Sequence, residues 1–322
     1  MADVYVDCFS HALGDTKAHV SESETAGRLL SSAADLGSAG FEWHHMCEPS
    51  TTAYDLAAAA VRQLPEPELR AGVDAIVYAT CLPGNGNVGD PARWRASGDV
   101  MHLMDFPGSR LQADFGLDDA VVVGITQQGC TTMLGALRMA RALLAAEPGW
   151  RRVLCVTADR FPEGSLYEHS YNLISDSAAA CLVGRAPAGF RMVTSHQITN
   201  GGLHRATNDE TLGSYFSYIT LLINQTLQRA GLDAGDITWV VPQNTNRAAW
   251  QIMPRVIKIE PSRVWQPSLP DNGHAISADN LINLASLATS GQVRRGDRVL
   301  LVVAGYGLNW QALVLEATEE FA

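Results

Sequence analysis

Short apolar runs alternate with amphipathic segments along this chain, which predicts strands covered by helices. The apolar run Gly72–Thr80 follows a segment with helical spacing from Ala53 to Leu64. A similar run, Asp236–Asn244, follows a second helical segment near Tyr218–Ala230. Uninterrupted Val, Leu and Ile runs are typical of parallel strands that are buried on both faces of a sheet. We therefore expect an α/β protein.

A second pair of apolar runs keeps the same order. Arg152–Ala158 has an echo in Arg298–Ala304, and each echo lies roughly 150 residues downstream of its counterpart. Two similar halves are the simplest explanation of such a repeat. The sequence predicts an N-terminal half over residues 1–185 and a C-terminal half over 186–322.

The most reactive candidate side chain lies in the first half, directly after an apolar strand. Val121–Val123 run into a glycine-containing turn, then Cys130, then a helical segment rich in small residues. The unpaired N–H groups and the dipole of a helix N-terminus favour a thiolate over a thiol. Cys130 is therefore a candidate nucleophile for acyl transfer through a thioester. A buried structural cysteine is the alternative, and it is common.

The composition excludes several classes of function. The formal net charge of −11 argues against nucleic-acid binding, and no apolar run reaches the length of about 18 residues that a membrane helix needs. The acidic N-terminus predicts no signal peptide. The cysteines lack metal-binding spacing, so we expect no metal, reduced thiols and a cytoplasmic protein. They are Cys8, Cys47, Cys81, Cys130, Cys155 and Cys181.

Five short motifs, in order, resemble those of the β-ketoacyl-ACP synthase III branch of the thiolase superfamily. The similarity covers nearly the whole chain and includes the nucleophile turn around Cys130. The motifs are Gln128–Thr132, Ser175–Ala180, Pro242–Asn246, Asp271–Ala275 and Gly305–Trp310. The resemblance implies a thiolase fold, in which duplicated βαβαβ halves form five αβαβα layers.

The resemblance also implies the surroundings of the nucleophile. Backbone N–H groups of Cys130 and Tyr306 would form the oxyanion hole, and no cofactor is expected. We expect Thr80, Leu82, Phe216 and Asn246 to contribute to the pocket. Members of the superfamily pair through the strand before the nucleophile helix, so a homodimer is expected.

The chain differs from the condensing members of this family at the position of a titrating side chain. Their nucleophile works with a His and an Asn, but Gln243 stands at the His position, while Asn272 stands at the Asn position. A Gln donates a neutral hydrogen bond and does not titrate near pH 7. His274, two residues beyond Asn272, is the candidate base; a loop histidine that is bonded to backbone is the alternative.

Three functions remain open after these departures. The first is an acyltransferase that moves an acyl group to an oxygen or nitrogen of a small acceptor, similar to synthase III-like enzymes of antibiotic assembly. The second is a decarboxylating condensing enzyme, and the third is a non-catalytic partner subunit. Residues 33–37 lack the Trp that stacks the adenine of CoA in the priming enzymes, which favours an acyl carrier protein as donor.

Overall fold

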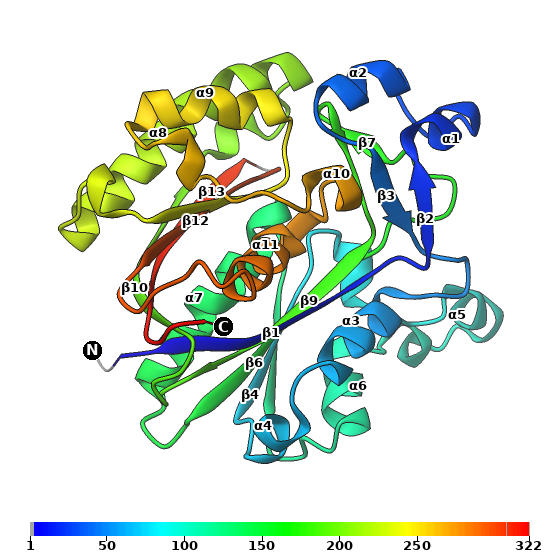
Figure 1. Cartoon of the computed structure of the whole chain (residues 1–322). Helices are drawn as coiled ribbons and strands as arrows, with labels where there is room; N and C mark the ends of the chain where they lie inside the picture. Colours follow the sequence, from blue (N-terminus) through cyan, green and yellow to red (C-terminus); the bar gives the residue numbers. More distant parts are fainter. Residues whose placement is uncertain (1–2, 307, 322) are drawn as a thin grey trace.

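Figure 1 shows the computed structural model of the chain, which describes residues 3–306 and 308–321. Its core is one nine-stranded mixed sheet with the strand order β11-β12-β13-β10-β1-β9-β6-β4-β5. The N-terminal strands are β1 (Tyr5–Leu13), β4 (Ala75–Ala79), β5 (Val121–Ile125), β6 (Arg152–Asp159) and β9 (Ser177–Gly184). The C-terminal strands are β10 (Phe190–Thr199), β11 (Trp239–Pro242), β12 (Arg298–Gly305) and β13 (Asn309–Ala317).

The sheet has nearly the same order when it is read inward from its two ends. The series β11-β12-β13-β10 mirrors β4-β6-β9-β1, and β5 is the additional edge strand. The two series join through a short pairing, Tyr5 with Arg191 and Val6 with Phe190. The strands of the predicted repeat, β4 with β11 and β6 with β12, take equivalent places in the two series.

Helices cover both series and fill the space between them (Figure 1). The central helices α7 (Thr132–Ala146) and α11 (Asp279–Ala288) share one apolar core with strands from both series. Helices α3 (Ala53–Arg62) and α6 (Pro107–Asp114) bury the outer face of the N-terminal series. Helices α8 (Asn208–Ala230) and α9 (Arg247–Ile257) bury the outer face of the C-terminal series. The predicted α/β class is confirmed.

Smaller elements decorate this framework. The remaining α-helices are α1 (Val20–Thr25), α2 (Ala33–Ser38), α4 (Glu66–Arg70), α5 (Pro91–Ser97) and α10 (Leu269–Asn272). The remaining strands form two small ladders, β2 (Thr16–His19) with β3 (Trp43–Met46) and β7 (Glu168–His169) with β8 (Asn172–Leu173). Over the residues that the structure describes, no helix is long and apolar enough to cross a membrane.

Local chemistry explains where the predicted elements begin and end. The α3 helix starts at a capping box in which Thr52 and Asp55 satisfy each other's backbone N–H groups. Every residue of β4 is buried, as its unbroken apolar run predicts. Because β4 and β5 run parallel, the loops after Ala79 and Ile125 leave the same edge of the sheet. That edge carries the nucleophile turn.

Candidate active site

Cys130 lies in a 3₁₀ turn, η3 (Gly129–Thr131), between β5 and α7. The turn is tight, and Gly129 adopts a positive φ of 56°. A Cβ atom at Gly129 would lie 2.5 Å from the backbone nitrogen of Tyr306, so only glycine allows this approach. A Cβ atom at Gly305 would lie 2.5 Å from the carbonyl oxygen of Gln128. The glycines thus let the nucleophile turn touch the end of β12.

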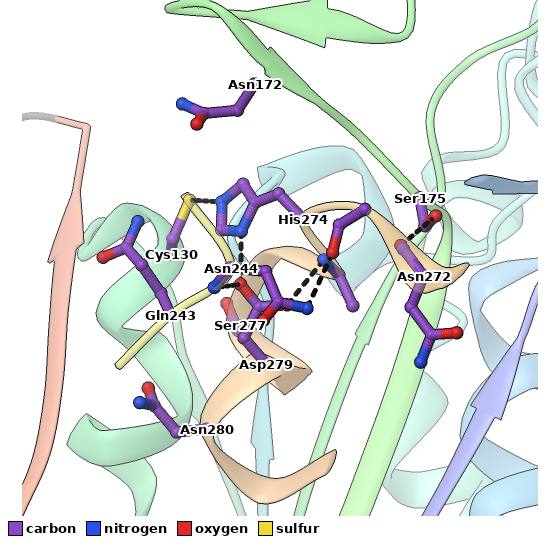
Figure 2. Close-up of polar contacts among 12 residues, drawn as sticks. Cys130, Asn172, Ser175, Gln243, Asn244, Asn272, His274, Ser277, Asp279 and Asn280 are labelled. Carbon is purple, nitrogen blue, oxygen red and sulfur yellow. Dashed lines mark hydrogen bonds and ion pairs between the residues drawn. The ribbon is translucent and has the colours of Figure 1, made fainter. Parts of the chain in front are cut away.

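A chain of side-chain hydrogen bonds runs from Cys130 to a buried carboxylate (Figure 2). His274 Nε2 is 3.3 Å from Cys130 Sγ, and His274 Nδ1 is 2.5 Å from Asp279 Oδ2. Asp279 is fully buried and also accepts the backbone N–H groups of Asn244 and Ala275, each at 2.7 Å. Nucleophile, imidazole and carboxylate therefore form a Cys-His-Asp arrangement, in which the acid orients the ring.

The electrostatics of this chain favour a thiolate–imidazolium pair. A hydrogen bond with the Cys81 thiol lowers the pKa of Cys130 well below its usual range, and the His274 charge adds to this against the effect of burial. Burial lowers the pKa of His274, but the Asp279 carboxylate and the Cys130 thiolate outweigh it and raise that pKa to about 10. These effects favour the thiolate form of Cys130, which is the form in which a cysteine is nucleophilic.

Cys81 is the second thiol at this site, and sequence reasoning did not single it out. It follows β4 directly, lines the same cavity as Cys130 and packs against the same apolar cluster. The contact with Cys130 and its own burial raise the pKa of Cys81, so it remains a neutral thiol. A neutral thiol can donate a hydrogen bond to the neighbouring thiolate.

Gln243 lies beside Cys130 in the cavity lining, but its side chain is already engaged. Its Oε1 accepts the backbone N–H of Ala304, at the end of β12. Its backbone carbonyl accepts a hydrogen bond from Gln266 Nε2 at 2.7 Å. Gln243 therefore fastens the loop after β11 to β12 and brings only an uncharged amide to the site.

Asn272 does not take the position that the sequence motif assigned to it. Its side chain points away from Cys130 (Figure 2), while its backbone carbonyl accepts the Ser175 hydroxyl at 2.6 Å. The next residue, Gly273, has φ 56° and ψ −152°, and this sharp turn directs His274 inward instead. The place beside Cys130 that the motif resemblance gave to Asn272 is therefore corrected, because the backbone reverses immediately after it.

The predicted pocket residues divide into two groups. Leu82, Phe216 and Asn246 line the cavity, whereas Thr80 does not. Thr80 is buried and donates its hydroxyl to Asp159 Oδ1 at 2.6 Å. Burial raises the pKa of Asp159 to about 6, despite hydrogen bonds from Thr80 and from the backbone of the following loop. Thr80 thus supports the loop that carries Cys81 and Leu82 rather than the substrate.

The cavity above Cys130 has a volume of about 1330 Å³. Its walls come from both halves and are largely apolar, and no Lys or Arg occurs among the described residues that line it. Groups of His, Cys, Asp and Glu that could hold a metal ion do not occur over residues 3–306 and 308–321. Such a cavity suits an uncharged acyl chain together with a small second substrate.

The predicted oxyanion hole stays a prediction. The approach of Gly129 to Tyr306 brings the backbone of β12 close to the nucleophile turn, as the expected pair of N–H donors requires. Asp279 was missed because its signal, an acid five residues after a loop histidine at the start of a helix, has no specificity on its own. The signal that the sequence did offer is Gly273, because a glycine between Asn272 and His274 permits the backbone reversal that points their side chains in different directions.

Comparison with known families agrees with this geometry. Residues 126–201 match the model described as 3-oxoacyl-[acyl-carrier-protein (ACP)] synthase III, and residues 227–317 match the corresponding C-terminal model. The chain belongs to the synthase III-like branch of the thiolase superfamily. This confirms the resemblance inferred from the five motifs and the thiolase fold that it implied.

Curated relatives of this synthase III-like protein are named β-ketoacyl-[acyl-carrier-protein] synthase III. The relative from Chlamydia caviae is 27% identical over 59% of this chain and 65% of its own length. The relative from Roseobacter denitrificans is 25% identical over 86% of this chain and 87% of its own length.

Solved structures show the same fold. A protein named ChlB3, described as an acyltransferase, superposes with a TM-score of 0.81 at 20% identity, covering 99% of both chains. The synthase III of Pseudomonas aeruginosa superposes with a TM-score of 0.78 at 19% identity, covering 99% of this chain and 100% of its own. The chain is thus a member of an enzyme family of acyl transfer and condensation.

Proposed function

We propose that this protein is an acyltransferase. Cys130 would take an acyl group from a thioester donor and pass it to an oxygen or nitrogen of a small acceptor. The observation that carries the proposal is the chain Cys130–His274–Asp279, with distances of 3.3 and 2.5 Å. This chain of residues stabilises the Cys130 thiolate twice: as the nucleophile that attacks the donor, and as the leaving group when the acyl group passes to the acceptor.

The first half-reaction follows from these contacts. The Cys130 thiolate attacks the donor carbonyl, and backbone N–H groups of Cys130 and Tyr306 would hold the oxyanion. Collapse of the tetrahedral intermediate forms acyl-Cys130 and expels the donor thiolate, which takes a proton from solvent. Asp279 keeps the His274 ring oriented throughout.

Two observations favour transfer over decarboxylating condensation. Decarboxylation of a malonyl group requires hydrogen-bond donors that point at the thioester oxygen and stabilise the negative charge that develops there. Here Asn272 points away, and His274 Nε2 contacts Cys130 (Figure 2). Gln243 accepts the N–H of Ala304 with its amide oxygen, so only its amide NH₂ group is left to donate.

The condensing reaction is the second candidate, because the curated relatives are named as synthases. Incubation with a malonyl thioester and an acyl primer separates the two functions. We expect acyl transfer without stoichiometric carbon dioxide; carbon dioxide with a β-keto product would favour the synthase.

The proposal includes the partners. An acyl carrier protein is the inferred donor. A role in secondary metabolism is supported by the likeness of fold to the priming β-ketosynthase of the R1128 polyketide pathway, with a TM-score of 0.76. We also propose a homodimer, since Val121 on the edge strand β5 is 51% exposed. Light scattering should then give twice the single-chain mass of 34.6 kDa.

The decisive experiment is intact mass spectrometry after incubation with a panel of acyl thioesters. We expect one acyl adduct on the wild-type protein and none on Cys130→Ala. Cys47→Ala is the matched control, because Cys47 is also a half-buried free thiol and its pKa is raised by burial. An adduct that persists on Cys130→Ala would contradict the assignment.

A further inference from the structure

A second histidine faces the cavity from the β7–β8 hairpin. His169 is the last residue of β7, and the hairpin turns through Ser170 and Tyr171, both with positive φ. Such a two-residue turn presents the residues beside it in a fixed direction. The side chain of Asn172 closes the turn by donating to the carbonyl oxygens of His169 and Ser170 at 3.3 and 3.0 Å.

The hairpin is held rigidly against the rest of the site. On one side, the Glu168 carboxylate accepts the backbone N–H groups of Leu30 and Ser31 at 2.8 and 2.7 Å. On the other side, β8 is fastened to the loop before α11, since the N–H of His274 donates to the carbonyl of Leu173, the last residue of β8, at 2.7 Å. The position of His169 is therefore tied to that of His274.

The imidazole of His169 is available for chemistry. Its ring packs edge-on against Tyr306 at 5.2 Å between centroids, and both residues line the cavity. Within the described residues, neither ring nitrogen has a hydrogen-bond partner. The ring thus lies beside the turn whose backbone N–H is the proposed oxyanion donor.

The two histidines have opposite electrostatic tendencies. Burial lowers the pKa of His169, the Cys130 thiolate raises it, and the His274 charge lowers it. Acylation of Cys130 removes the raising effect, so the neutral form of His169 is favoured further. Two acids of this wall are already engaged: Glu168 holds Leu30 and Ser31, and Asp209 accepts the Tyr171 hydroxyl at 3.4 Å. The phenol ring of Tyr306 packs against His169 itself.

His274 is poorly suited to accept a proton from the incoming substrate. Acylation also removes the raising effect of the Cys130 thiolate on the pKa of His274, but the Asp279 carboxylate, which raises that pKa more, still favours the cationic ring. A cation stabilises the departing Cys130 thiolate but does not act as a base. Pairs of titratable groups with opposed environments usually divide the acid and base roles between them.

We propose that His169 is the general base for the acceptor, while His274 remains the cationic partner of Cys130. This rests on the proposed acyltransferase function. In the step, the acceptor N–H or O–H gives its proton to the free imidazole, and the acceptor oxygen or nitrogen bonds to the acyl carbon. The carbon–sulfur bond breaks, its electron pair returns to Cys130 as thiolate, and His169 then releases the proton to solvent.

The test separates loading of Cys130 from release of the acyl group. The S-acetyl thioester of N-acetylcysteamine loads the protein, and intact mass follows loss of the acetyl group in glycerol-containing buffer across a pH series. We expect wild-type release to rise with pH to a plateau, with a midpoint below about 6.5, the ordinary value for histidine. His169→Gln and His169→Asn should release about a hundredfold more slowly and lose this pH dependence.

Two controls distinguish a base from a structural residue. Hydroxylamine, which needs no base, should release acetyl from wild type and both His169 variants at equal rates. His204→Gln, a change at an exposed histidine outside the cavity lining, should match wild type.

Four outcomes would overturn the inference. The first is His169→Gln releasing acetyl at the wild-type rate and with the wild-type pH dependence. The second is a His169 variant that loses Cys130 loading, hydroxylamine release and glycerol release to the same extent, as a structural role would predict. A wild-type acyl-enzyme that only hydroxylamine releases would exclude any base for the acceptor. No adduct on wild type would overturn the acyltransferase proposal as well, whereas normal loading with His169-independent release overturns this inference alone.

Discussion

The loop after β11 and the loop before α11 both face Cys130, yet their polar side chains are used differently. In the first loop, Gln243 is neutral and fastened to β12 through the N–H of Ala304. In the second loop, His274 bridges Cys130 and Asp279 and carries a charge. The titrating side chain of this site thus lies on the loop before α11, whereas the loop after β11, where the motif resemblance places the family's His, carries only a neutral amide.

The comparison shows that two loops beside one cysteine carry different kinds of polar side chain, one neutral and one charged. The two loops remain tied together, because the Asn244 N–H donates to Asp279 at 2.7 Å and its side chain donates to the Gly273 carbonyl at 2.8 Å. The loop after β11 therefore supports the charged loop instead of supplying a titrating group. Three changes test this division.

The largest effect is expected from removing the imidazole. His274→Ala should slow acylation of Cys130 by about a hundredfold to ten-thousandfold, because the thiolate loses its cationic partner. Gln243→Ala should slow it by about tenfold or less, since no charge is lost. Stopped-flow loading with an acyl thioester measures both. Equal losses in the two variants would show that the loops do not differ in this way.

Asp279→Asn should have an intermediate effect with a distinct pH signature. With Asp279 present, the thiolate–imidazolium pair persists from the lowered pKa of Cys130 up to about pH 10, where His274 deprotonates. Without the carboxylate, the pKa of His274 falls, and the pKa of Cys130 rises as the cation is lost. The window therefore narrows from both sides. The pH at which iodoacetamide alkylation of the thiolate sets in should rise, which reports the acid edge, and NMR titration of the His274 ring reports the alkaline edge. An unchanged window would assign Asp279 a purely structural role.

The smallest effect is expected from Gln243→His, which restores a titrating group to the first loop. Carbon dioxide release from a malonyl thioester should rise by about tenfold or less, because Asn272 still points away from Cys130. Gln243→Asn is the control, as it keeps a neutral amide. A full synthase rate in Gln243→His would mean that this one position decides between the two reactions.

Much of the framework could be predicted because apolar runs report burial directly. The strands β4 and β11 fall within the predicted runs, and β6 and β12 each end one residue beyond theirs. The turn that holds Cys130 was also accessible, since a strand, a tight turn and a helix are sequential features, whereas the role of Cys130 as nucleophile stays a prediction. The boundary between residues 185 and 186 stays a prediction, although it falls between β9 and β10.

The arrangement of the polar loops was not accessible from the sequence. Asn272 and His274 are two residues apart, and a single glycine with positive φ decides which of them faces Cys130. The bond from His274 to Asp279 depends on how the turn enters α11. Side-chain direction in such loops is set by tertiary contacts, which local patterns do not encode.

The size of the cavity has a consequence for the efficiency of turnover. A volume of about 1330 Å³ holds on the order of forty water molecules at about 30 Å³ each, so a short acyl group leaves most of it wet. Water then competes with the acceptor for every loaded acyl group. The ratio of hydrolysis to product should fall as the acyl chain lengthens or as acceptor concentration rises. When the acceptor is scarce, the protein would hydrolyse its acyl donor without forming the acyl-acceptor product.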